Sequence, residues 1–343
     1  MINPNSQLPT PNKLPTPNSQ QDSPPKSPPG GSEGGRRWLL GVGSLLGVGI
    51  WGLGFSAQGC GRADGAPPAS PIRIIGGQGS TDGYFATPRG GAWDPRGFLS
   101  VVDKTGRIQK FDASGKFVRV WMPPAVERGH PTNLAIDAEG QVLVADTHYH
   151  RVLRYSPDGE LLAQFGSEGR EPGQFLYPVG IAVTAEGTIY VSEYGGNDRI
   201  QVFTPEGKLL RAWGTYGEGP GEFKRPQGIA LGNDRLYVAD AANHRVQVFS
   251  LDGKLTGAWE DLKYPYSVSV DARGDVLVAE YGRHRVTKFR PDGTRAGSAG
   301  KAGRGPGDLN TPWGVVAAGD AIYVLDSGNH RVQRWPGTVL GKP

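Results

Sequence analysis

From about residue 71 onward, short apolar runs alternate with short polar or glycine-containing segments. Between residues 225 and 249 three such runs, 228–231, 236–239 and 246–249, are separated by turn-forming residues. Runs of about four to six aliphatic, β-branched and aromatic residues between turn formers predict strands that are joined as hairpins. No run in this unit has the spacing of an amphipathic helix. The pattern therefore predicts an all-β fold.

The same unit recurs six times, with a proline before each first strand at intervals of 39 to 48 residues. Self-similarity at such a period indicates a repeat architecture. The prolines are Pro88, Pro131, Pro178, Pro226, Pro265 and Pro312. Each copy also has an acid after its second strand, at Asp103, Asp146, Glu193, Asp240, Glu280 and Asp326. Each third strand begins at an arginine, at Arg107, Arg151, Arg199, Arg245, Arg285 and Arg331.

Two copies contain the tripeptide Asn-His-Arg, at 243–245 and 329–331. Together with the strand pattern, this motif resembles the NHL repeat family, which is named after an Asn-His-Leu type motif. The resemblance covers roughly residues 71–340. It implies a β-propeller of four-stranded antiparallel blades.

The two ends of the repeat region complement each other. Residues 72–75 form an apolar run that has no strand before it, and they align with the outer strand of the later copies. The sixth copy runs through its third strand to Trp335 and has no fourth strand. We therefore predict six blades, with residues 72–75 completing the last blade by pairing with 331–335. Closure of this kind leaves no free sheet edge.

The segment before the repeats has a different composition. Residues 1–35 are rich in Pro, Ser, Asn, Gln and Gly, so we expect a disordered leader. Residues 36–60 begin with Arg36-Arg37 and continue as a Gly-rich apolar run, which resembles a twin-arginine signal. Residues 61–70 are expected to be a linker to the propeller, residues 71–343.

The apolar run ends at Cys60, the only cysteine of the chain. It is a candidate for lipidation, because a small residue precedes it as in a lipoprotein processing box. The alternative is a chance thiol beside an uncleaved transmembrane segment, since about 20 apolar residues can cross a bilayer. Either reading predicts a membrane-anchored propeller on the extracytoplasmic side of a bacterial membrane, periplasmic or at the cell surface.

The recurring acids and arginines could be catalytic pairs or structural ion pairs. One active site needs a few unlike groups, whereas a residue repeated in every blade performs one structural role six times, so we expect ion pairs. The same argument covers the histidine of the repeat, which occurs as His150, His244, His284 and His330. Blade three has Asp198 at that position. His130 and His148 lie outside the pattern, and two histidines are too few for a zinc site.

The residue after each proline differs from copy to copy, and specificity requires residues that are not repeated. These residues should surround one mouth of the central channel, with residues from the loops between second and third strands beside them. The candidate ligand-binding residues are Arg89, Thr132, Gln227, Tyr266, Trp313, His148, Tyr194 and Tyr281. Such a rim suits protein, peptide or glycan contacts. The alternative is a set of ordinary solvated loop residues.

Two classes of function remain. The first is a non-enzymatic platform that binds a protein, peptide or glycan of the cell envelope as a monomeric propeller. The second is an extracytoplasmic enzyme. The resemblance points to amidating lyases, whose zinc histidines follow the blade prolines, or to calcium-dependent lactonase-like propellers, which have Glu, Asn and Asp at the channel mouth. Here no histidine follows a blade proline and only Asn133 comes near the calcium pattern.

The first class is favoured, and we expect no catalytic residue, no metal and no cofactor. Some NHL domains bind RNA through a basic face. A net charge of +4 over 343 residues is mild, and export would separate the propeller from RNA, so we expect no nucleic acid as a partner.

Overall fold

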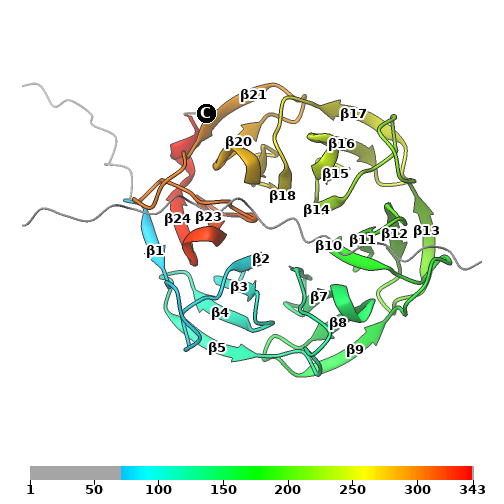
Figure 1. Cartoon of the computed structure of the whole chain (residues 1–343), viewed down its shortest axis with the longest axis horizontal. Coiled ribbons are helices and arrows are strands. Elements are labelled where there is room, and N and C mark those ends of the chain that lie inside the picture. The colour runs from blue at the N-terminus through cyan, green and yellow to red at the C-terminus, as the bar shows by residue number, and fades with distance from the viewer. Residues whose placement is uncertain (1–70, 342–343) are drawn as a thin grey trace, which may run out of the picture. The chain divides into compact units, whose positions relative to one another are not determined.

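The described part of the chain is a ring of six blades. The computed structural model describes residues 71–341. They form six four-stranded antiparallel sheets around a central channel (Figure 1). In five blades the strands follow one another in sequence order from the channel outwards. The prediction of an all-β, six-bladed propeller is confirmed.

The first three blades have the following strands. Blade one contains β2 (Pro88–Asp94), β3 (Phe98–Asp103), β4 (Ile108–Asp112) and β5 (Phe117–Trp121). Blade two contains β6 (Asn133–Ile136), β7 (Val142–Asp146), β8 (Arg151–Tyr155) and β9 (Leu161–Phe165). Blade three contains β10 (Tyr177–Val183), β11 (Ile189–Tyr194), β12 (Arg199–Phe203) and β13 (Leu209–Trp213).

The other three blades repeat this arrangement. Blade four contains β14 (Pro226–Gly232), β15 (Arg235–Asp240), β16 (Arg245–Ser250) and β17 (Leu255–Trp259). Blade five contains β18 (Pro265–Val270), β19 (Val276–Glu280), β20 (Arg285–Phe289) and β21 (Arg295–Ala299). Blade six contains β22 (Gly314–Ala318), β23 (Ala321–Asp326), β24 (Arg331–Pro336) and β1 (Arg73–Ile75).

The sixth blade takes its outer strand from the other end of the propeller. Strand β1 pairs antiparallel with β24, with Ile75 opposite Val332. Figure 1 shows β1 beside β24, where the blue and red ends of the colour scale meet. The predicted closure by an N-terminal strand is confirmed.

Burial is greatest on the second strands and least on the outer strands, and this explains the hydrophobic pattern. Every residue of the second strands β7, β19 and β23 is buried, because each blade packs between two neighbours. The outer strand β9 is almost fully exposed. Six apolar clusters fill the spaces between adjacent blades. Face-to-face packing of the blades therefore provides the core.

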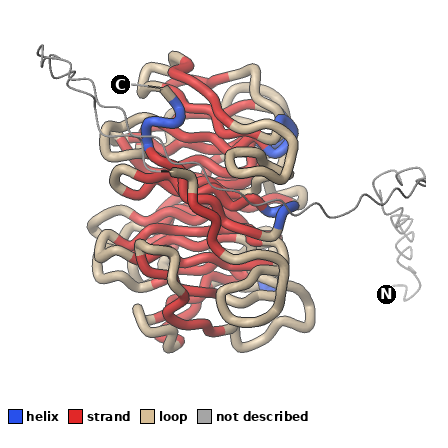
Figure 2. Tube along the Cα trace, turned by 90° about the vertical axis from the view of Figure 1, so that its left-hand side faces the viewer, coloured by secondary structure: helices blue, strands red, loops and turns tan. Residues whose placement is uncertain are grey.

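Short helical turns mark one rim of the ring. In four blades a 3-10 turn connects the second and third strands: η1 (Thr147–Tyr149), η2 (Ala241–Asn243), η3 (Tyr281–Arg283) and η4 (Ser327–Asn329). Figure 2 shows helical turns gathered on one side of the ring. A fifth, η5 (Gly337–Leu340), follows β24 and buries Leu340. The first strands begin on the same rim as η1 to η4, and we call it the proline-side rim. The repeat pattern predicts the loops of this rim but not their 3-10 turns.

The closure can be tested at Ile75, which is 5% exposed and packs with Phe85 and Phe111. Ile75→Ala should lower the free energy of unfolding by about 2 to 4 kcal/mol, since it leaves a cavity in the core. Removal of residues 71–80 should destabilise the whole propeller further. The measurement is chemical denaturation of each variant.

The matched control lies on the same strand. Ile74 is 41% exposed, so Ile74→Ala should change the unfolding free energy by less than about 1 kcal/mol. An unchanged stability of the Ile75→Ala variant would show that β1 does not close the ring.

Candidate functional site: the proline-side mouth of the channel

The acid that ends each second strand is a buried hub of hydrogen bonds. In blade four, the Asp240 carboxylate accepts hydrogen bonds from Arg245 at 2.9 Å, from the backbone N–H of Lys224 at 2.8 Å and from Asn243 at 2.9 Å. Asp240 itself is fully buried. A buried carboxylate needs such partners, because an uncompensated charge in the interior is costly.

The corresponding ion pair forms in all six blades. The N–O distances lie between 2.6 and 2.9 Å for Asp103–Arg107, Asp146–Arg151, Glu193–Arg199, Asp240–Arg245, Glu280–Arg285 and Asp326–Arg331. In five blades the acid also accepts the backbone N–H two residues before the blade proline. The predicted structural ion pairs are confirmed, and they fix the start of each of these blades.

A buried glutamine on the third strand adds a second connection that the sequence analysis missed. The side chain of Gln247 accepts a hydrogen bond from Gly221 N–H at 2.9 Å and donates one to the Glu222 carbonyl at 2.7 Å. Gln109, Gln201 and Gln333 make the same pair of bonds. These four blades are the ones preceded by the Gly-rich linker. The occurrence of this glutamine in the blades that follow a Gly-rich linker was the signal in the sequence that could have revealed the contact.

The repeat histidines connect neighbouring blades. Nδ1 of His244 accepts a hydrogen bond from Tyr264 N–H at 3.2 Å, just before the next proline. His284 bonds Thr311 N–H at 3.0 Å and His330 bonds Thr87 N–H at 3.1 Å in the same way. In blade three the Asp198 carboxylate replaces the histidine and accepts from Arg225 N–H at 2.7 Å. These three histidines are structural, as expected.

The residues after the prolines converge on one mouth of the channel. They line a common space of about 20 Å³, which is room for about one water molecule. The six residues are Arg89, Thr132, Val179, Gln227, Tyr266 and Trp313. Asn133 also lines this space. Their side chains therefore nearly close the channel at the proline-side rim.

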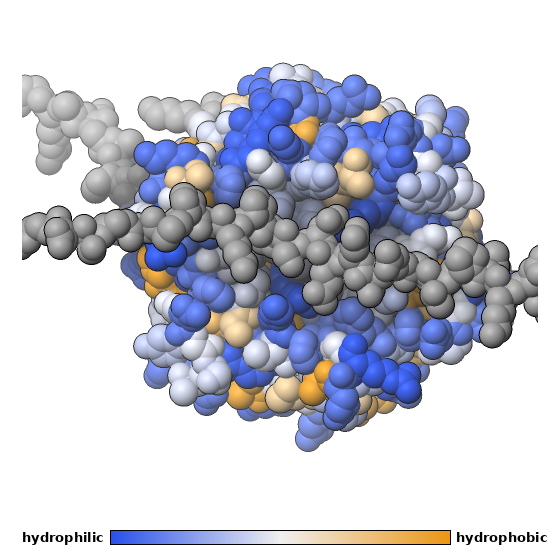
Figure 3. Space-filling view, in the orientation of Figure 1, coloured by the Kyte–Doolittle hydropathy of each residue, from blue (hydrophilic) through white to orange (hydrophobic). Residues whose placement is uncertain are grey.

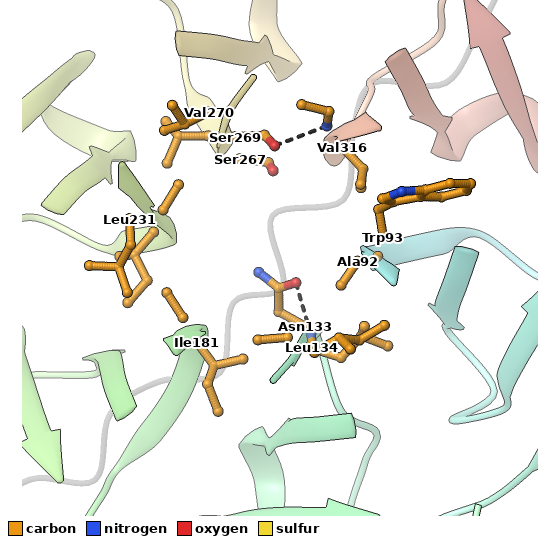
Figure 4. Close-up of a pocket in the computed structure, with 18 of the residues that line it drawn as sticks. Ala92, Trp93, Asn133, Leu134, Ile181, Leu231, Ser267, Ser269, Val270 and Val316 are labelled. Carbon is orange, nitrogen blue, oxygen red and sulfur yellow. Dashed lines mark hydrogen bonds between the residues drawn. The ribbon is translucent and has the colours of Figure 1, made fainter. Parts of the chain in front are cut away.

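Behind this mouth the channel is wider, and most of the side chains that line it are apolar. A cavity of about 270 Å³ is lined by the first strands of all six blades. Figure 4 shows Asn133 pointing into this channel from blade two, with Leu231, Ile181 and Val316 on the surrounding strands. The Asn133 carboxamide is the most prominent polar group in this view. Ser267 and Ser269 also line the cavity, so polar groups are present there as well as at the mouth.

An aromatic belt surrounds the mouth. The rings of Tyr266 and Trp313 form a T-shaped pair with 5.4 Å between their centroids, and Tyr266 stacks on Tyr281 with 4.6 Å between centroids. On the opposite side Tyr194 stacks on Tyr177 at 5.4 Å. Each ring is held by a neighbour, so the belt presents a preorganised surface.

All eight candidate ligand-binding residues contribute to this region. Five of them line the mouth. Tyr281 stacks on Tyr266, and Tyr194 lies close to Arg89. The His148 ring lies with its centroid 6.0 Å from that of Tyr177. The structure adds Tyr177 and Arg225, which the sequence analysis missed. Both immediately precede a blade proline, and Arg225 lies over the Tyr194 ring at 5.4 Å.

The mouth is electropositive. Burial and the nearby charge of Arg89 lower the pKa values of both His130 and His148, which favours neutral imidazoles at pH 7. Burial raises the pKa of Tyr194, against the opposing effects of Arg225 and Arg89. The Tyr194 hydroxyl therefore stays protonated at neutral pH and can act as a donor. The positive charge comes from the two arginines.

The repeat sequence matches a known family model. The NHL repeat model matches residues 175–203, 223–249, 262–289 and 309–335, one segment in each of blades three to six. The chain is an NHL-repeat propeller. Each segment of this propeller contains the buried acid and ends on the third strand.

Two curated proteins share part of the NHL-repeat sequence. Protein brain tumor of Drosophila melanogaster is 36% identical over 73 residues, which is 21% of this chain and 7% of that protein. A probable peptidyl-alpha-hydroxyglycine alpha-amidating lyase of Caenorhabditis elegans is 32% identical over 130 residues, 35% of this chain and 37% of that protein. The matches thus span a minor part of both relatives.

Solved structures share the fold of this NHL propeller at low sequence identity. A gluconolactonase from Xanthomonas campestris is 16% identical with a TM-score of 0.57, covering 80% of this chain and 99% of that chain. Likeness at this identity establishes the architecture and not the activity.

Two further properties concern residues 71–341 alone. Within this range no three His, Cys, Asp or Glu side chains are grouped so as to hold a metal ion. In the same range no helix is long and apolar enough to cross a membrane. The expected leader, the signal or anchor at 36–60 with Cys60, and the linker all lie outside the described residues.

The structural role of the hubs can be tested in blade four. Arg245→Met should lower the free energy of unfolding by about 3 to 5 kcal/mol, because it leaves the Asp240 carboxylate buried without its cation. The control is Glu218→Gln, which breaks the exposed Lys224–Glu218 pair and should cost less than about 1 kcal/mol. Equal effects of the two substitutions in thermal or chemical denaturation would contradict this role.

Proposed function

We propose that this NHL propeller is a non-enzymatic binding platform that captures a protein or peptide through the proline-side mouth. The observation that carries the proposal is the convergence of the unrepeated side chains on one electropositive, aromatic mouth. The scaffold positions repeat from blade to blade, whereas the mouth residues do not. Variation confined to one surface of a rigid scaffold is typical of a recognition site.

The chemistry of the mouth suits a protein ligand. Trp, Tyr and Arg are the residue types that contribute most to binding energy at protein interfaces. Trp313, Tyr266 and Arg89 lie side by side here, with Arg89 over the Trp313 ring at 5.1 Å. Where described residues are visible in Figure 3, the surface is largely hydrophilic with scattered apolar side chains.

The enzymatic alternative is supported by one observation, the 130-residue similarity to the probable amidating lyase. An enzyme of that kind would place its reacting groups near the channel mouth. His130, His148 and Tyr194 are titratable side chains near Arg89. This reading predicts lyase or lactonase turnover that depends on a bound metal.

The proposal also places the propeller on the outer side of a bacterial membrane, anchored through its N-terminal segment. Its support is the sequence of residues 36–60, with Arg36-Arg37 before an apolar run and Cys60 at its end. A partner would then belong to the cell envelope. Lipidation at Cys60 and an uncleaved span both remain compatible with this location.

The binding role can be tested by removing the two largest mouth side chains. Trp313→Ala combined with Tyr266→Ala should abolish capture of envelope proteins in a pull-down with the full-length protein. The matched control removes Leu162 and Leu210, which are 51% and 52% exposed on outer strands. The control should capture as well as wild type, and melting curves should show both variants folded.

Two outcomes contradict the platform. One is undiminished capture by the folded mouth variant. The other is stoichiometric zinc or calcium in the purified protein whose removal by a chelator abolishes a lyase or lactonase activity. The second result would establish the enzymatic alternative.

Export can be tested at Arg36 and Arg37. Lys at both positions should block export by the twin-arginine route, because that machinery recognises the guanidinium pair. Protection of the propeller from external protease in intact spheroplasts would show the block. The control is Arg62→Lys in the linker, which should be exported normally. Unchanged protease accessibility of the double variant would point to ordinary insertion as a transmembrane anchor.

A further inference from the structure

We infer that the mouth binds the terminal carboxylate of a peptide chain, with Arg89 as the primary contact. This inference rests on the proposed binding role of the same mouth and specifies its ligand chemistry. It is carried by three features, which are an arginine without an acceptor, additional free donors around it, and aromatic faces that are already covered.

Arg89 is the first feature. Among the described residues, none of its three guanidinium nitrogens donates a hydrogen bond to the chain, and its Nε is fully buried without a partner. The guanidinium instead lies over the Trp313 ring at 5.1 Å. Buried arginine donors in proteins are normally satisfied. An acceptor supplied by a ligand would complete this site, and burial already holds the pKa of Arg89 below its usual value.

The acids near Arg89 have other partners. Asp103 is bonded to Arg107 at 2.8 Å and to Thr105. Asp198 accepts hydrogen bonds from the backbone of Gly196 and of Arg225. The charge of Arg89 is therefore left for a ligand.

Further hydrogen-bond donors lie at the mouth together with Arg89. Asn133 uses its carboxamide oxygen on Leu134 N–H at 2.9 Å, while its NH2 group donates to none of the described residues. The side chain of Gln227 is also without a hydrogen bond within residues 71–341, and it lines the same space. Arg225 makes no ion pair in this range and lies over Tyr194. A group with two acceptor oxygens and one negative charge matches this set.

The geometry favours the end of a chain over a sugar acid. Sugars bind aromatic residues by stacking on exposed ring faces, and here each of these rings already has a face covered by a neighbouring side chain. Arg89 covers Trp313, Arg225 covers Tyr194, and Tyr266 stacks on Tyr281. The space between the mouth side chains is only about 20 Å³. A small planar carboxylate at the tip of an extended peptide can enter such a mouth, with the aromatic belt around its last side chain.

The test uses the full-length protein in mild detergent and a defined probe. The probe is N-acetyl-alanyl-phenylalanine with a free carboxylate, and the same dipeptide as its C-terminal amide is the neutral comparison. Titration calorimetry and the NMR signal of the Arg89 Nε–H group report binding. The free acid should bind and shift this signal, and the amide should bind about ten- to a hundredfold more weakly, as expected for losing a charged hydrogen bond.

Variants locate the contact. Arg89→Gln should reduce the affinity for the free acid about ten- to a hundredfold. The affinity of Arg89→Lys should lie between those of wild type and Arg89→Gln, because lysine keeps the charge but lacks the planar fork of donors. The matched control is Arg273→Gln, which removes the same charge from an exposed turn on the opposite rim and should bind like wild type. Melting curves confirm that each variant is folded.

Each contrary result has a defined meaning. Equal binding of acid and amide, or undiminished binding by Arg89→Gln, overturns the carboxylate site. Equal binding of glucuronate, or of N-acetyl-glutamate amide, overturns the assignment to a chain end. If wild type and Arg89→Gln capture the same envelope partner equally well, this site is wrong while the platform stands. If wild type binds the dipeptide acid but captures no partner, the carboxylate site stands and the platform fails.

Discussion

The buried acid at the end of each second strand is the interaction on which the propeller depends. A carboxylate in the interior is tolerated only when donors surround it. Asp240 obtains them from the next strand through Arg245, from its own turn through Asn243 and from the loop before the blade through Lys224. Satisfying one charge therefore fixes the positions of three separate segments. The glutamine and histidine contacts extend the same network to the linker and to the next blade.

This network separates stability from recognition. In five blades the backbone before the proline is held by the acid, and at three of these places a histidine of the preceding blade holds it too, as at Lys263 and Tyr264. The residue that follows the proline is then free to vary, since the fold makes no demand on its side chain. Trp313, Arg89 and Gln227 occupy equivalent positions, yet they have nothing in common chemically. Six structurally equivalent backbone positions thus present six different side chains at one mouth of the channel.

Much of this could be predicted from the sequence, because repeated residues report repeated contacts. The six copies, the closing strand and the acid–arginine pairs follow from the repeated residues, and the blade architecture follows from the resemblance to NHL repeats. The role of Gln247 was harder to foresee, since its partner lies in a linker 26 residues earlier and the only sign of the contact is that the glutamine recurs in the blades that follow such a linker. Tyr177 and Arg225 were missed because their importance depends on which way their side chains turn. The covering of Trp313 by Arg89 likewise depends on side-chain packing across the join between the first and last blades.

The pairing of β1 with β24 has a consequence for the order of events during synthesis. Ile75 leaves the ribosome among the first residues of the propeller, whereas its partner Val332 is made among the last of them. The ring therefore cannot close until β24 has been made, and until then β1 has no strand to pair with. Contacts between such distant residues form slowly, because a long loop has to be closed first. Closure of the ring is thus tied to synthesis of the sixth blade.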